Sequence, residues 1–160
     1  MAKTFFITGA EGTGKSSIIP FLKTKVSELN IHDFDENGVP ENPPLQWRLD
    51  TTLHWINKAK KNQEKNLSTC IVGLSFPNEV KALKESKDLE KILFCLLDVS
   101  KEEREKRLSK RNASKEVIKD LHQLNQLKKE TQFNPKIIDT SYLSIKETAN
   151  RVVDWIKNGE

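Results

Sequence analysis

The sequence predicts an α/β fold in three layers, with a five-stranded parallel sheet between two layers of helices. Short apolar runs alternate along the chain with longer stretches that carry helical spacing or helix-capping residues, which is typical of a parallel sheet covered on both faces. The runs at 67–74 and 92–97 are largely apolar, as strands buried on both faces are. Because there is no internal repeat and no low-complexity linker, we expect a single domain over residues 1–160.

The first half of the chain begins with a short apolar run at 3–8, which leads at once into glycines and then into a helix-competent stretch at 16–29. This order predicts a strand, a loop and a helix. A second strand is expected at 31–34. The double proline Pro43-Pro44 then opens a helix, because proline is tolerated in a first turn and the apolar residues that follow keep helical spacing: Leu45, Leu49, Leu53 and Ile56.

The middle of the chain carries the third and fourth strands, at 67–74 and at Ile92–Asp98. Between these two strands Pro77 starts a helix, which we expect to end near Ser86.

The last part of the chain is marked by two capping boxes. Ser100 with Glu103 caps a long basic helical region, and Ser144 with Glu147 caps a final helix. The fifth strand is expected between them at Lys136–Asp139. The final helix places four apolar residues on one face, which should pack on the sheet: Ala149, Val152, Val153 and Ile156.

Composition narrows the classes of function. Apolar residues make up 36% of the chain, no apolar run approaches the roughly 20 residues needed to cross a bilayer, and no charged-then-apolar leader precedes the first strand. We therefore expect a soluble, cytoplasmic protein that does not engage a membrane. Cys70 and Cys95 each lie inside an apolar run, where a cysteine is expected to be a small buried side chain in a reducing compartment.

Positive charge is concentrated in one region. Residues 101–136 contain 11 Lys and Arg against 6 Asp and Glu, a net +5, so the rest of the chain carries −1. A basic helical region can serve nucleic acid or can clamp the phosphates of a nucleotide. Phe133 is the one Phe, Tyr or Trp in this stretch, so the charges lack a series of aromatic stacking platforms for bases, and nucleic acid is not the expected partner.

The glycines after the first strand form a Walker A phosphate loop. The pattern G-x-x-x-x-G-K-[ST] is met at every required position by Gly9-Ala10-Glu11-Gly12-Thr13-Gly14-Lys15-Ser16, between a predicted strand and a predicted helix. Backbone N–H groups of such a loop surround phosphate oxygens, Lys15 should reach the β- and γ-phosphates, and the Ser16 hydroxyl should ligate Mg²⁺. We expect a nucleoside triphosphate to contact the loop at Gly9, Glu11, Gly12, Thr13, Gly14, Lys15, Ser16 and Ser17.

Two carboxylates follow the second strand. In an extended segment Asp33 and Asp35 lie on the same side, and strand ends at one edge of a parallel sheet face the ligand crevice. The alternative for both residues is a solvated acidic turn. Asp98, at the end of the fourth strand, is a second candidate on the metal side, for which we favour a structural role.

The phosphate loop together with Asp33-Phe34-Asp35 resembles the P-loop kinases of small molecules, especially the shikimate-kinase-like and nucleoside-monophosphate-kinase-like group, over essentially the whole chain. The resemblance implies the P-loop kinase fold. It also implies that Asp33 is the acid near Mg²⁺ and that Asp35 is the base near the acceptor hydroxyl.

Trp47-Arg48 is similar to the aromatic–arginine start of a substrate-binding motif in these kinases, which makes Arg48 a candidate for acceptor binding. Where shikimate kinases have three glycines after the third strand, this chain has Gly73-Leu74-Ser75. The departure favours an acceptor other than shikimate.

The resemblance also implies a short basic lid at about 107–130. By position Arg107 and Arg111 match the lid arginines that contact transferring phosphates and stack on the base, with Arg111 the catalytic candidate. Thr140 falls in a loop that resembles the one beside adenine. Arg104 and its two neighbours are also interspersed with glutamates, so ordinary pairing on a helix surface is the alternative for them.

The expected activity is an ATP- and Mg²⁺-dependent transfer of the γ-phosphoryl group to a small hydroxyl-bearing metabolite. A nucleoside or nucleotide kinase is the alternative within the enzyme class. The alternative from another class is a nucleotide-dependent switch or accessory ATPase that has no acceptor. The identity of the acceptor, the choice between ATP and GTP, and the oligomeric state have no signal in the sequence.

Overall fold

The computed structural model describes residues 1–130 and 134–158. Its centre is a five-stranded sheet in the order β2-β3-β1-β4-β5, and every neighbouring pair is parallel. The strands are β1 (Thr4–Thr8), β2 (Asn30–Asp33), β3 (Thr69–Val72), β4 (Ile92–Asp98) and β5 (Lys136–Asp139). The predicted three-layer α/β fold with a parallel five-stranded sheet is confirmed.

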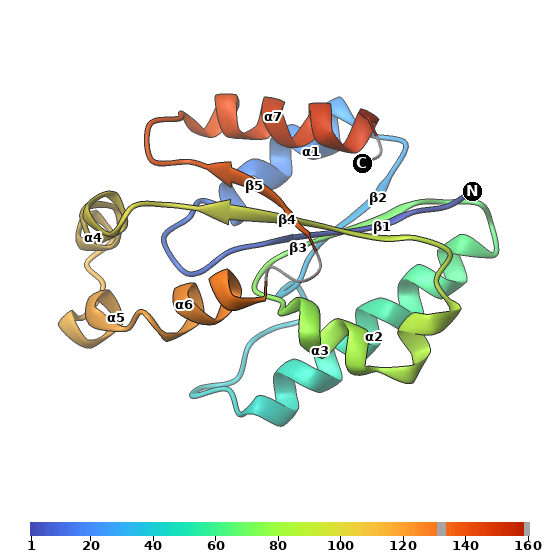
Figure 1. Ribbon diagram of the computed structural model, residues 1–160, viewed down its shortest axis with the longest axis horizontal. Coiled ribbons are helices and arrows are strands. Elements are labelled where there is room, and N and C mark those ends of the chain that lie inside the picture. The colour runs from blue at the N-terminus through green and yellow to red at the C-terminus, as the bar shows by residue number, and fades with distance from the viewer. Residues whose placement is uncertain (131–133, 159–160) are drawn as a thin grey trace.

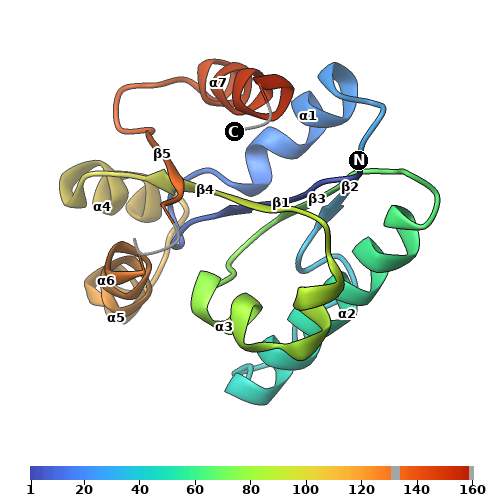
Figure 2. The ribbon, with the colours of Figure 1, turned by 45° about the vertical axis from the view of Figure 1, so that its right-hand side comes forward.

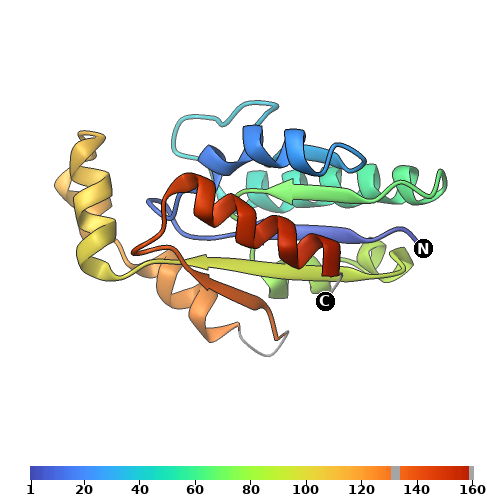
Figure 3. The same ribbon diagram turned by 90° about the horizontal axis from the view of Figure 1, so that it is seen from above.

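Helices cover both faces of the sheet (Figures 1 and 3). On one face lie α1 (Ile19–Lys25) and α7 (Ile145–Asn158), which contact each other. The other face carries α2 (Leu45–Gln63), α3 (Pro77–Ala82) and the 3₁₀ turn η2 (Lys84–Asp88). The layers follow from alternation along β1, where Phe5 and Ile7 join the apolar cluster under α1 and α7 while Phe6 joins the cluster under α2.

The basic region after β4 consists of three short helices, α4 (Lys101–Lys110), α5 (Lys115–Lys119) and α6 (His122–Lys129). They gather at the end of the sheet toward which the strands point (Figures 1 and 2). The break after α4 falls at Asn112, whose φ of 56° is left-handed, and Ser114 then caps α5 by accepting the Val117 N–H. Leu127 of α6 packs with Phe76 and Leu96 in a third apolar cluster, which fixes α6 to the sheet.

Two helices differ from their predicted extents. The helix expected at 16–29 begins as a 3₁₀ turn, η1 (Ser16–Ile18), and ends at Lys25. Pro20 has no N–H for the Ser16 carbonyl, which instead accepts from Ile19, so the first turn is tight. The helix that begins at Pro77 ends at Ala82, and the chain continues as η2 rather than as one helix to Ser86.

Both predicted N-caps form. The Ser100 hydroxyl accepts the Glu103 N–H at 3.3 Å, and the Ser144 hydroxyl accepts the Glu147 N–H at 3.1 Å. In a full capping box the Glu103 side chain would accept the Ser100 N–H. Here the Ser100 N–H instead donates to Ser141 Oγ at 2.8 Å. This bond ties the start of α4 to the loop between β5 and α7.

Cys70 and Cys95 are free and buried in the cluster beneath α1 and α7. Burial raises the pKa of both thiols, that of Cys95 to about 12. Within the described residues, no helix is long and apolar enough to cross a membrane.

Candidate nucleotide-binding site

The loop after β1 is packed too closely for larger residues at its glycines. A Cβ on Gly9 would lie 2.5 Å from Thr13 Oγ1 and 2.8 Å from the Leu97 carbonyl oxygen. Gly12 has a φ of 89°, a conformation that L side chains rarely adopt, and a Cβ there would meet Arg104 and Leu108 at 3.2 Å. Glycine is thus favoured at Gly9 by close packing and at Gly12 by both packing and backbone conformation.

Hydrogen bonds within the loop converge on the Ala10 carbonyl, which accepts from the Thr13 hydroxyl at 2.8 Å and from Lys15 Nζ at 3.2 Å. Desolvation lowers the pKa of Lys15, and the negative charges of Glu11 and Asp35 oppose that shift. The Lys15 ammonium group thus lies against the Ala10 carbonyl of the loop, near the carboxylates of Glu11 and Asp35.

Arg104 of α4 is hydrogen-bonded to the phosphate loop. The residue is only 3% exposed, and its Nε donates to the Glu11 carbonyl at 3.1 Å. Its two terminal nitrogens donate to carbonyls at the end of α5, those of Val117, Ile118 and Asp120, at 2.8 to 3.3 Å. One buried guanidinium group thus joins the phosphate loop to the second helix of the basic region.

Arg107, one turn further along α4, makes a second set of bonds to the loop. It donates to the Gly12 carbonyl at 3.3 Å, to Thr140 Oγ1 at 3.0 Å and to the Thr140 carbonyl at 2.6 Å, and it pairs with Glu103. The Thr140 hydroxyl donates to the Asp98 carbonyl at 2.9 Å. The loop before α7 is thereby joined to both the phosphate loop and the end of β4.

Two cavities open on either side of the phosphate loop and share Gly14, Ser17 and Arg111 in their walls. The first has a volume of about 470 Å³ and also contains Lys15, Ser16, Asp35 and Arg48. The second, of about 350 Å³, lies between α4 and the start of α7 and contains Arg107 and Thr140. Arg111 makes no side-chain hydrogen bond or ion pair with the described part of the chain.

The two predicted carboxylates are placed differently. Asp35 lines the first cavity, and its pKa is raised by desolvation and by the neighbouring charge of Asp33, while Lys15 opposes the shift. Asp33 lines neither cavity, and its Oδ1 accepts the Asp35 N–H at 2.9 Å. Asp33 thus holds the turn that presents Asp35, and its charge still acts on Lys15.

Arg48 reaches the first cavity from α2, but it is already paired. Its Nε and Nη2 donate to the two carboxylate oxygens of Glu79 on α3, at 3.0 and 2.6 Å, and its guanidinium carbon lies 4.7 Å from the centre of the Phe76 ring. Trp47, on the neighbouring position of α2, forms part of the cavity wall.

The Ser16 hydroxyl is an oxygen donor in the first cavity that suits Mg²⁺, and carboxylates lie in the same lining. No group of three or more His, Cys, Asp or Glu residues that could hold a metal occurs in the described ranges. This donor set fits Mg²⁺, which usually binds one or two protein oxygens and completes its octahedron with phosphate oxygens and water. Asp98 lines neither cavity; its carboxylate lies 3.8 Å from Lys128 Nζ and accepts the Val99 N–H.

Sequence reasoning missed Glu79 and Gln123, which lines the first cavity from α6, and it named Arg104 only as one of the arginines after the fourth strand, without a role at the loop. For Arg104 a signal was present, since it lies four residues before the buried Leu108 and therefore on the inner face of α4. Glu79 and Gln123 carry no sequence signal, because their neighbours at the site come from distant parts of the chain.

The parallel sheet, with a Walker A loop leading from its central strand into α1, defines the fold of the P-loop kinases. Solved structures with this fold match nearly the whole chain at low identity. A sugar kinase from Janibacter sp. HTCC2649 in unliganded form superposes with a TM-score of 0.72 at 16% identity, covering 98% of this chain and 95% of that one. Shikimate kinase from Aquifex aeolicus (TM-score 0.61, 12% identity, 98% and 97% covered) and thymidylate kinase from Candida albicans (0.60, 14%, 99% and 92%) are also similar. No protein-family model matches the chain, and no curated protein matches its sequence.

Proposed function

We propose that the protein is an ATP- and Mg²⁺-dependent phosphotransferase that moves the γ-phosphoryl group to a small hydroxyl-bearing metabolite. The observation that carries the proposal is the pair of cavities that meet at Gly14, Ser17 and Arg111 beside the phosphate loop. A donor nucleotide on one side and an acceptor on the other would meet there, at the place where the γ-phosphate would lie.

In this arrangement the base and ribose of ATP occupy the second cavity, near Arg107 and Thr140, and the loop from Gly9 to Ser17 binds the phosphates. Ser16 would hold Mg²⁺, with Asp33 as the acid on the metal side, and the ion would neutralise charge on the phosphates. Lys15 and Arg111 stabilise the charge that develops on the transferring group.

The acceptor occupies the first cavity, between Asp35 and Arg48. Asp35 takes the proton of the acceptor hydroxyl while the hydroxyl oxygen bonds to the γ-phosphorus. The bond from that phosphorus to the bridging oxygen of ADP breaks at the same time. The raised pKa of Asp35 suits a general base, because proton transfer is most efficient when the pKa of the base approaches the working pH.

A nucleotide-dependent switch is the second candidate. It is favoured by Arg104, which joins the Glu11 carbonyl of the phosphate loop to the end of α5 and would carry a change in the loop to the basic helices. A nucleoside or nucleotide kinase remains a version of the first candidate, since thymidylate kinase is among the similar folds.

The deciding test is transfer of the γ-phosphate from ATP with Mg²⁺ to a pool of nucleosides, nucleotides, sugars and sugar acids, read by mass spectrometry. A product heavier by one phosphoryl group supports the kinase, whereas tight ATP binding without any product supports the switch. Lys15→Ala should remove nearly all turnover, and Asp35→Asn should lower kcat far more than ATP affinity. Asp154→Asn, an exposed carboxylate on α7, is the matched control. Equal losses of kcat and ATP affinity in Asp35→Asn would contradict its role as base.

A further inference from the structure

Arg48 is the cation in the first cavity that is remote from the phosphate loop, and its charge is cancelled by Glu79. Both side chains are largely buried, with 25% and 16% of their surfaces exposed. The paired edge of the guanidinium group is occupied by the two carboxylate oxygens, and one face is covered by Phe76. Nη1 makes no hydrogen bond within the described residues, and this leaves its two N–H donors for a ligand.

The remaining charges around the acceptor are negative once the nucleotide is bound. Lys15 and Arg111 lie beside the phosphate loop and would be neutralised by the phosphates, so that Asp35 and the neutral Arg48–Glu79 pair face the acceptor. A carboxylate or phosphate on the acceptor would approach Asp35 and Glu79 without a free cation to receive it. Like charges brought together in a partly desolvated site repel strongly.

The walls of the cavity suit an uncharged ring. The apolar part of the lining is formed by Phe34, Val39, Pro43, Trp47 and Leu74. Among the polar lining groups, the Gln123 amide, Arg48 Nη1 and the Asp35 carboxylate can bind hydroxyls. A volume of about 470 Å³ accommodates one small molecule of this kind.

We propose that the acceptor is an uncharged, hydroxyl-rich ring molecule, such as a sugar or a nucleoside, and that Glu79 sets this preference by neutralising Arg48. The inference rests on the proposed phosphotransfer. Glu79 acts here as a specificity-determining residue that works through Arg48.

The test uses pairs of acceptors that differ by one anionic group: D-glucose with D-gluconate, and adenosine with adenosine monophosphate. Each is offered to the full-length protein with ATP and Mg²⁺, and kcat/KM is measured by ADP release and confirmed by the mass of the product. For the pair that is phosphorylated, we expect the neutral member to exceed the acid by at least about tenfold. The pair that reacts also distinguishes a sugar from a nucleoside.

Faster transfer to the acids, or equal rates within the reacting pair, would overturn the neutral-acceptor proposal while leaving the kinase intact. If ATP binds and no acceptor of either kind is phosphorylated, the kinase proposal fails, and the acceptor proposal fails with it.

The variant Glu79→Gln tests the cause of the preference. It removes the negative charge and keeps an oxygen that can accept from Arg48, so the ratio of neutral to acidic kcat/KM should fall about tenfold. Because the ratio is measured within one variant, a loss of folded protein affects both members equally. Glu28→Gln, an exposed residue in the loop between α1 and β2, changes the net charge by the same amount and should leave the ratio unchanged. An unchanged ratio in Glu79→Gln would refute the role assigned to Glu79.

Discussion

Asp35 lies between two charges of opposite sign, and they act on its pKa in opposite directions. Desolvation and Asp33 raise the pKa, while Lys15 lowers it. Removing the charge of Asp33 leaves desolvation as the main cause of the rise. Asp33 therefore changes the pKa of the proposed base, Asp35, although Asp33 lines neither cavity.

We predict that Asp33→Asn shifts the acid limb of the kcat/KM profile to lower pH. The base must be ionised to accept a proton, so activity falls as pH drops through the pKa of Asp35, and a lower pKa moves that fall downward. The introduced asparagine keeps an oxygen for the Asp35 N–H, so the turn should persist. The measurement is the pH dependence of kcat/KM for wild type and variant, and an upward shift would contradict the assignment.

Replacing the buried Arg104 should cost a large part of the free energy of unfolding, because its side chain donates four hydrogen bonds to backbone carbonyls. In Arg104→Met the carbonyls of Glu11, Val117, Ile118 and Asp120 lose their donor in a buried place. We expect the free energy of unfolding to fall by about 2 to 4 kcal/mol, and ATP affinity to weaken because the loop loses its support. Urea unfolding and ATP titration measure both effects.

The matched control for Arg104 is Lys106→Met, an exposed position on the same helix, which should be near neutral. Similar losses in the two variants would mean that the buried bonds of Arg104 contribute little.

The sequence places Lys15 and Ser16 at the phosphate loop because they belong to a contiguous motif. It leaves Glu79 unidentified because the contact with Arg48 joins residues 31 positions apart, on different helices. It assigns Arg48 to acceptor binding but gives no sign that a carboxylate cancels its charge. Local spacing therefore predicts the phosphate side of the site, and the acceptor side depends on packing between elements.

Thr140 joins the loop between β5 and α7 to α4 and to the end of β4 through its hydrogen bonds. Its hydroxyl donates to the Asp98 carbonyl and accepts from Arg107, and its side chain is 1% exposed. The loop thus holds Arg107 beside the second cavity.

We predict that Thr140→Val lowers the free energy of unfolding by about 1 to 3 kcal/mol, since valine has the same shape and leaves buried polar partners unpaired. ATP should bind several-fold more weakly, because Arg107 loses an acceptor that holds it at the cavity. Thermal unfolding and isothermal titration with ATP give the two quantities. Thr24→Val, at an exposed position of α1, should change neither, and an unaltered affinity in Thr140→Val would argue against a nucleotide in the second cavity.

Element types and order follow from the apolar pattern, whereas their ends depend on local chemistry that the pattern does not report. Pro20 turns the first helix after the loop into a 3₁₀ start, and Asn112 breaks the basic region after one helix. The apolar pattern also does not predict which strands lie next to each other in the sheet. That β1 lies between β3 and β4 is set by the packing of whole layers.

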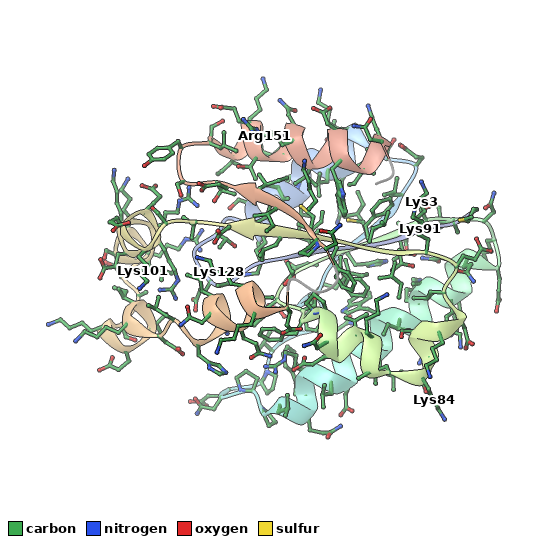
Figure 4. The ribbon with its side chains drawn as sticks, in the orientation of Figure 1. Lys3, Lys84, Lys91, Lys101, Lys128 and Arg151 are labelled. Atoms are coloured by element: carbon green, nitrogen blue, oxygen red, sulfur yellow. The ribbon has the colours of Figure 1, made fainter. Side chains whose placement is uncertain are left out.

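Over the whole molecule, the basic side chains are spread widely. Lys101 and Lys128 lie at the end with α4 and α6, and Lys3 and Lys91 lie at the opposite end (Figure 4). In the basic region itself, Arg104 and Arg107 point their charge at the phosphate loop. These two charges of the basic region thus lie beside the expected position of the phosphates.

A nucleotide that binds only the folded protein should raise its stability. With Mg²⁺-ATP at 100 times its Kd, we predict a gain of about 2.7 kcal/mol in the free energy of unfolding, seen as a higher Tm. Lys15→Ala should lose most of this gain without a comparable loss of Tm in the absence of nucleotide. If ATP leaves the Tm of the wild-type protein unchanged over a wide range of concentrations, nucleotide binding itself is contradicted.

The two cysteines lie in β3 and β4, the strands that flank β1 on either side, and both thiols are buried. A thiol reagent added to the folded protein can therefore react only when the packing between the sheet and α1 and α7 opens, and the high pKa of each thiol keeps its reactive thiolate scarce until then. The rate of thiol modification thus reports the opening of this layer without an engineered label. It also follows that the folded protein is protected from cross-linking through its thiols in air.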